Sequence, residues 1–178
     1  LEKGMDFDLK IDTKDASLAE LFSLVPTDFQ KWYEGMTFDG KTTIGVTLKG
    51  IMEESVSKPN LDIAINIQEG KIGAKAYSND PVEHLNTDVQ ITMPSLEADS
   101  LSVTINQFDF TLGKGFAKGK ALFKMPMYVD AEVKSELDVT QLWKTLAIDG
   151  MKLQGNVLLD GVVKGSYATK EVKTKSGK

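Results

Sequence analysis

The sequence predicts a mainly β fold: one long antiparallel meander sheet, curved or forming an open sandwich, with one apolar face and two or three short helices. Between Met36 and Leu137 apolar and polar residues alternate almost throughout, which is the period of a half-buried strand. Short turns separate the alternating stretches, and such connections join antiparallel neighbours because a parallel crossover needs about a dozen residues. Since most strands have one apolar and one polar side, the sheet is expected to have one apolar face.

The N-terminal region predicts a strand followed by a helix. Apolar residues alternate with charged ones over 7–11, as expected for a strand. Ser17 is a suitable helix N-cap, and Glu20 three residues later completes a capping box ahead of apolar residues at helical spacing. Pro26 ends or interrupts that helix. Residues 27–33 predict a second short helix.

Further alternating stretches follow in the central region, and the whole chain is predicted to contain about eight to ten strands. Glu69 and Gly70 predict a hairpin turn, and Gly113 and Gly115 predict another. The alternation changes phase at 106–107, between two apolar runs. The alternating stretches are 44–48, 61–67, 72–76, 85–93, 101–105, 108–112, 121–125 and 129–137.

Part of the chain is repeated. Residues Glu34–Gly50 (EGMTFDGKTTIGVTLKG) align without a gap on Asp149–Gly165 (DGMKLQGNVLLDGVVKG) at a spacing of 115, with five identities in seventeen places. The helical pattern of Ser17–Val25 returns as Asp138–Leu146 at a spacing of 121, with Asp138 as the cap of a second helix. One unit of strand, helix and meander is therefore followed by the opening of another.

The repeat predicts the domain organisation. Residues 1–126 form a first repeat unit, and residues 127–178 begin a second that continues the same sheet. With 178 residues the chain is long enough for one core of ordinary size, so a single structural domain is expected.

Composition excludes several classes of function. The net charge is −5 and every basic residue is lysine, whereas nucleic-acid binders normally carry a basic stripe with arginine. No cysteine is present, so a disulfide framework, a thiolate metal site and a thiol nucleophile are ruled out. No run approaches the roughly 20 apolar residues that span a bilayer. Because the chain begins at Leu1, we interpret it as a fragment or processed form, with any membrane anchor outside it.

Catalytic signatures are also missing from the sequence. His84 is the only histidine, and the serines lack a GxSxG elbow that would supply a nucleophile beside it. The favoured interpretation of His84 is a surface turn residue. The GKG at 113–115 is not followed by a phosphate-binding helix, and no DxDxDG calcium loop occurs. We therefore expect no catalytic residue, metal site or cofactor.

The apolar face allows two interpretations. It can be the core of the protein, covered by a second sheet or by helices. It can also continue from one repeat to the next as an open trough suited to acyl chains, because the expected helices are few and short. The first interpretation predicts a structural or adhesive β-module that binds a protein partner, and the second predicts a lipid-binding protein.

Three motifs resemble the AsmA-like family of bacterial envelope proteins, which is grouped with TamB among the bridge-like lipid transporters. The first is the [SD]-[LV]-x-x-L-[FW] helix at Ser17–Phe22 and Asp138–Trp143. The second is the G-M-x-[FL]-x-G-x8-K-G element at Gly35–Gly50 and Gly150–Gly165. The third is the strand, Gly-centred turn and strand order of Pro59–Ile91. Together they cover nearly the whole chain and resemble the C-terminal region of the family.

The resemblance implies a taco-like β-sheet that shields phospholipid or other acyl-lipid tails between the inner and outer membranes, or helps maintain the outer membrane. It implies no catalytic residue and no cofactor, a periplasmic location, an inner-membrane anchor outside this chain, and envelope protein partners. Lysines at the rim of the trough are expected to solvate its edge or meet phosphate headgroups; they are Lys71, Lys75, Lys118, Lys120 and Lys124. The expected lipid-groove residues are Ile63, Ile65, Ile67, Val89, Ile91, Val103, Ile105, Phe108, Phe110, Phe123, Met125, Val129 and Val133.

Overall fold

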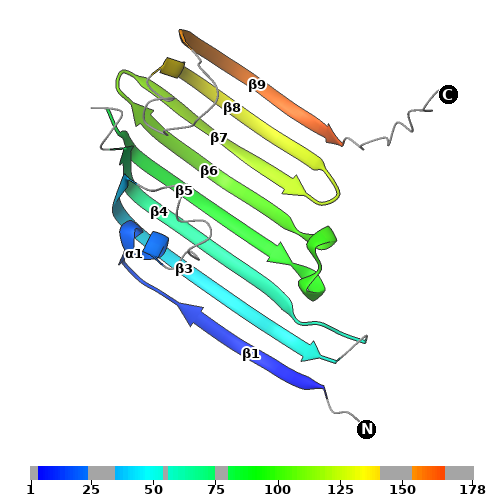
Figure 1. Ribbon diagram of the computed structural model, residues 1–178. Helices are drawn as coiled ribbons and strands as arrows, with labels where there is room; N and C mark the ends of the chain where they lie inside the picture. Colours follow the sequence, from blue (N-terminus) through cyan, green and yellow to red (C-terminus); the bar gives the residue numbers. More distant parts are fainter. Residues whose placement is uncertain (1–3, 24–34, 54–55, 75–79, 141–153, 167–178) are drawn as a thin grey trace, which may run out of the picture.

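The computed structural model describes residues 4–23, 35–53, 56–74, 80–140 and 154–166. They form a single nine-stranded antiparallel sheet that does not close on itself, as the alternation predicted (Figure 1). The strands are β1 (Met5–Asp12), β2 (Ala16–Ser17), β3 (Met36–Met52), β4 (Asn60–Ala74), β5 (Val82–Met93), β6 (Ser102–Leu112), β7 (Gly115–Lys124), β8 (Tyr128–Asp138) and β9 (Asn156–Ser166). The helical elements are α1 (Leu18–Ser23) and two 3-10 turns, η1 (Pro94–Leu96) and η2 (Ala98–Ser100).

The sheet is a meander. Its strand order is β1-β3-β4-β5-β6-β7-β8-β9, and the short β2 pairs with β3 beside β1. Within the described residues, each long strand therefore pairs only with the long strand that precedes or follows it in the chain, and the connections between β3 and β8 are short, as expected of antiparallel neighbours. Figure 1 shows β1 and β9 at the two opposite edges.

The helix α1 begins with the predicted capping box. The backbone N–H of Glu20 donates to Ser17 Oγ at 3.1 Å, and the backbone N–H of Ser17 donates to Glu20 Oε2 at 3.0 Å. α1 packs on β3, where Leu18 is fully buried and the ring of Phe22 stacks on Phe38 at 3.9 Å between centroids. The short helix is thereby held over one end of the sheet.

The later helices fall largely outside the described residues. The backbone N–H of Thr140 donates to Asp138 Oδ1 at 2.8 Å, which is the bond expected of the predicted cap. The rest of that helix and the helix expected over 27–33 lie outside the part of the chain that the structure describes.

The hairpin turn predicted at Glu69 and Gly70 is wrong. β4 continues through these residues, and the pairing of β4 with β5 shifts register on both sides of Gly70. Glu69 has a φ of 50°, so the Glu-Gly pair makes a β-bulge within the strand. An acid followed by glycine favours positive φ in either setting, and the local sequence does not distinguish a bulge from a turn.

Bulges occur side by side on four neighbouring strands. β3 shifts register around Gly40, β4 around Glu69, β5 around His84 and β6 between Ile105 and Phe108. The shift on β6 confirms the phase change predicted at 106–107. Since bulges bend a strand and increase its twist, this line of irregularities curves the sheet between its two ends.

The two copies of the sequence repeat have equivalent pairings. β1 pairs with β3 so that Phe7 faces Gly50, and β8 pairs with β9 so that Val129 faces Gly165. The expected boundary at 126–127 falls in the connection between β7 and β8, and the sheet continues across it.

Candidate functional site: the apolar face of the sheet

Strand pairing places apolar residues from every long strand on one face. Residues that lie directly opposite each other in an antiparallel pair project to the same side of the sheet. From β1 to β9 the pairing can be followed as one row, in which each residue faces the next: Ile11, Val46, Ile63, Ile91, Val103, Phe123, Val129 and Gly165. The alternating positions, such as Asp62 and Gln90, project to the other side and make it polar.

A second row runs parallel to the first. It crosses from β3 to β9 and contains Ile44, Ile65, Val89, Ile105, Ala121, Ala131 and Val163. Ala121 on β7 and Ala131 on β8 have small side chains, so the surface is lower at these two positions than at the larger branched residues on either side. The result is a broad hydrocarbon surface formed by side chains from strands far apart in the sequence.

The expected groove residues all belong to strands or turns of this surface. Twelve of the thirteen lie within the paired strands on the apolar face, and Met125 lies in the turn between β7 and β8. The Phe123 side chain is 42% exposed and that of Met125 41%, and the other eleven are half-buried.

The apolar face is packed most tightly at one end. A buried cluster of Val82, Leu112, Ala117 and Leu137 lies where β5 and β7 begin and where β6 and β8 end. Phe108 and Phe110 pack against this cluster, with 6.5 Å between their ring centroids.

The opposite end of the sheet is more exposed. Met5 and Met52 face each other there, and they are 64% and 39% exposed. Met127, in the connection to β8, is 37% exposed. The buried cluster thus lies at one end of the apolar face, and these exposed methionines lie at the other.

No second sheet covers the apolar face within the described residues. All nine strands belong to one sheet, and α1 is the one described α-helix that packs on it. The residues described thus form an open β-surface and not a sandwich of two sheets.

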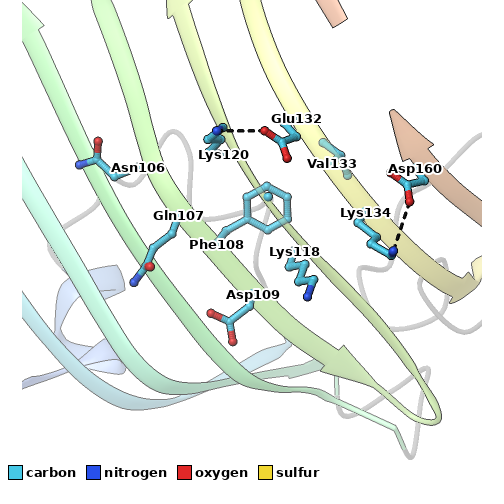
Figure 2. A pocket seen from close by; sticks show the side chains of 11 residues that line it. Asn106, Gln107, Phe108, Asp109, Lys118, Lys120, Glu132, Val133, Lys134 and Asp160 are labelled. Atoms are coloured by element: carbon cyan, nitrogen blue, oxygen red, sulfur yellow. Dashed lines mark ion pairs between the residues drawn. The ribbon is translucent and has the colours of Figure 1, made fainter. Parts of the chain in front are cut away.

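The opposite, polar face carries a shallow hollow of about 660 Å³ over β6 to β9 (Figure 2). Two ion pairs lie in it: Lys120 Nζ is 2.9 Å from Glu132 Oε2, and Lys134 Nζ is 3.2 Å from Asp160 Oδ2. The hydrogen bond to Glu132 raises the pKa of Lys120. Paired charges of this kind keep the polar face hydrated.

The lysines expected at the rim of the trough are placed differently. Lys118 and Lys120 line the hollow in the middle of the polar face, and Lys71 pairs with Glu83 on that face at 2.7 Å. The reason is the strand period of two, which sends each lysine to the side opposite its apolar neighbours. Lys124 lies at the end of β7, and Lys75 lies outside the described residues.

His84 lies at a strand bulge, where its φ is 52°, and not in a turn. Its Nδ1 is 2.6 Å from Glu69 Oε2, and both side chains are about two-thirds exposed. The hydrogen bond to Glu69 raises the pKa of His84, and the same bond lowers the pKa of Glu69. Sequence reasoning missed this pair because its partners are fifteen residues apart and are brought together by two aligned bulges.

Two classes of site are absent from the described residues. No group of three or more histidine, aspartate or glutamate side chains is placed to hold a metal ion in the part of the chain that the structure covers. Among the helices described, none has the length and apolar character needed to cross a membrane.

No family model, curated protein or solved structure matches this chain.

Proposed function

We propose that this chain is a segment of a non-enzymatic cell-envelope protein whose apolar β-face shields lipid tails from water. The proposal includes membership of the AsmA-like family, a periplasmic location, and anchoring in the inner membrane through a segment outside this chain. The role would be phospholipid transport between the inner and outer membranes, or maintenance of the outer membrane. The supporting observation is the unbroken apolar row that crosses the sheet from Ile11 on β1 to Val129 on β8 and reaches Gly165 on β9.

The dimensions of the row suit an acyl chain. It crosses eight paired strands, and seven inter-strand spacings of about 4.8 Å make it roughly 34 Å long. One acyl chain occupies half of the roughly 30 Å hydrocarbon core of a bilayer. The apolar row is therefore long enough to lie along a whole lipid tail.

The chemistry of the face also suits a lipid tail. Burial of each methylene contributes about 0.8 kcal/mol, so a long chain is held without any hydrogen-bonding site. Exposed Phe123 and Met127 offer further apolar contact area at the open end. A surface without directional contacts holds different acyl chains alike and lets them slide, as passage along the face requires.

Photo-crosslinking from neighbouring residues tests this proposal. Ile91 lies on the apolar face, and Gln90, the residue before it on β5, lies on the polar face. A photoreactive benzophenone amino acid is placed at one position or the other, so the two probes sit on the same strand and differ in the face that they contact. The purified chain is mixed with phosphatidylethanolamine and phosphatidylglycerol vesicles, irradiated, and analysed by mass spectrometry for lipid adducts. Adducts from position 91 and few from position 90 are expected.

Equal labelling from the two positions contradicts the proposal, and so does the absence of adducts from both. In cells the same two variants distinguish lipid binding from the alternative function. Crosslinks from position 91 to protein alone, with no lipid in solvent extracts of the purified chain, favour a structural or adhesive β-module whose apolar face is covered by a protein partner.

A further inference from the structure

The two edges of the sheet differ in how well they are protected. An exposed edge strand offers free N–H and C=O groups to another strand, and charged side chains are a common protection. β1 (Met5–Asp12) has four charged residues among its eight. β9 (Asn156–Ser166) has only Asp160 and Lys164 among its eleven, and no proline.

Apolar residues on β9 are unusually exposed, and on both faces. Leu158 is 79% exposed and Val162 is 69% exposed on the polar face of the sheet, and Val163 is 65% exposed on the apolar face. A strand with large apolar residues on both sides is expected to be covered on both faces, and the side chains of a second neighbouring strand would cover part of each face. Yet among the strands that the structure describes, β9 is the last in the sheet order and pairs with β8 alone.

The sequence of β9 is self-complementary about Val162. If a second copy lies antiparallel to it with Val162 facing Val162, Asp160 faces Lys164 twice, once in each direction. On the apolar side Leu159 then faces Gly165, and Gly161 faces Val163, so Leu159 and Val163 each meet a glycine. Opposite charges placed directly across an antiparallel pair stabilise it.

The charges inside one chain continue this pattern. Lys134 pairs with Asp160 at 3.2 Å, and Asp130 pairs with Lys164 at 2.7 Å. In the paired strands the polar face would carry a row of alternating sign, formed by Lys134 and Asp160 of one copy followed by Lys164 and Asp130 of the other. The hydrogen bond to Asp130 raises the pKa of Lys164, which keeps that lysine charged.

We propose that β9 is a dimerisation edge, at which two copies of this chain pair antiparallel about a two-fold axis at Val162. The symmetry is closed, so pairing stops at two chains and does not grow into a fibre. The axis is perpendicular to the sheet, and the apolar faces of the two copies therefore lie on the same side of one continuous sheet. This pairing does not depend on what the apolar face binds.

Single cysteines test the pairing and its register, because the chain contains no cysteine of its own. In the proposed register Val162→Cys places two thiols opposite each other, with Cα atoms about 4.5–5.5 Å apart, within disulfide range. Leu158→Cys is the control on the same strand and face. Its two thiols would be eight residues apart along the strands, roughly 27 Å. Mild oxidation is expected to give a covalent dimer from Val162→Cys and monomer from Leu158→Cys.

Sedimentation of the 178-residue chain over a range of concentrations provides the second measurement. The unmodified chain is expected to double in mass as its concentration rises, and Val162→Lys, which sets two like charges face to face on the axis, is expected to stay monomeric. Val56→Lys is the matched control, since Val56 is 73% exposed in the connection between β3 and β4. It is expected to dimerise like the unmodified chain.

Three results would overturn the proposal. The first is an unmodified chain that stays monomeric at every concentration, which would leave the β9 edge to a strand of different sequence. The second is a dimer that survives Val162→Lys. The third is crosslinking through Leu158→Cys but not through Val162→Cys, which would show another register. The cysteine variants keep the proposal testable if the lysine variant does not fold.

Discussion

The pair of Glu69 and His84 shows how backbone geometry creates an electrostatic contact at the level of single residues. Both residues have φ near 50°, a conformation that side chains other than glycine adopt infrequently. The backbone N–H of Glu69 donates to Asn86 Oδ1 at 3.0 Å, and Asn86 Nδ2 donates to the carbonyl of His84 at 2.9 Å. Asn86 thus ties the two bulges together and supports the ion pair above them.

The titration of His84 is predicted to depend on Glu69. The pKa of His84 is raised above 6.5, mainly through its hydrogen bond to Glu69, so Glu69→Gln is expected to lower it. Glu83→Gln is the control, since Glu83 contributes least to the shift. With one histidine in the chain, imidazole NMR signals against pH give the answer directly. Equal midpoints in all three proteins would show that the pair does not form in solution.

The same pair gives a pH dependence of stability with a definite sign. Because the pKa of His84 is raised in the folded state, its contribution to the stability of the fold is fully present below about pH 6.5. That contribution is lost as the pH rises through the folded pKa. The lowered pKa of Glu69 makes its contribution complete above about pH 4.5, with loss as the pH falls through the folded pKa. The stability difference between the unmodified chain and Glu69→Gln, from urea unfolding, should be largest between these values.

Gly40 is predicted to be required in the bulge of β3. Its φ is 119°, and a Cβ added there would lie 2.7 Å from the Cα of Gly70 on the neighbouring strand. Since backbone atoms cannot easily move away, Gly40→Ala is expected to cost about 2 kcal/mol or more in the free energy of unfolding. Gly165→Ala is the control, because nothing lies within 4 Å of its added Cβ. Similar unfolding midpoints in urea for the two variants would contradict the prediction.

At the level of elements, local patterns predicted the strands and the first helix because each depends on nearby residues. The capping box of Ser17 and Glu20 formed as expected, since both partners lie within one helical turn. The period of two placed Ile63, Ile65 and Ile67 on one face without knowledge of their partners. The hairpin predicted at Gly70 failed because a bulge depends on the register of the neighbouring strand.

The helix α1 is predicted to depend on its cap. Ser17→Ala removes the hydroxyl that accepts the N–H of Glu20 and is expected to cost about 1 kcal/mol. Ser17→Asp, which retains an acceptor, should restore most of this loss. Hydrogen exchange at the α1 amides measures the effect locally, and unchanged protection in Ser17→Ala would show that packing on β3 alone holds the helix.

At the level of the whole molecule, the structure has its tightest packing at one end of the sheet, whereas apolar side chains on the two edge strands are exposed. Leu112 is 1% exposed in the buried cluster, whereas Leu9 is 47% exposed on β1. The sequence alone does not reveal this difference, because both residues occupy equivalent places in an alternating pattern. It arises from the position of each residue along and across the sheet.

Two leucine-to-alanine truncations are predicted to differ strongly in how much they lower the free energy of unfolding. Leu112→Ala leaves a cavity in the packed cluster and should cost about 2–5 kcal/mol. Leu9→Ala should cost less than about 1 kcal/mol, because half of that side chain is already in water. Chemical unfolding of the two variants provides the comparison. Equal losses would mean that the sheet is buried evenly and that its apolar face is covered along its whole length.

The meander order also determines how the molecule would respond to mechanical force. Met5 and Ser166 lie at the same end of the sheet, on opposite edges. A pull between them acts across the strands and loads the ladder hydrogen bonds one after another instead of shearing them together. The outermost strands would peel away first, and the inner ones would stay paired. Extension should therefore proceed as several small releases at low tension, and not as one abrupt rupture.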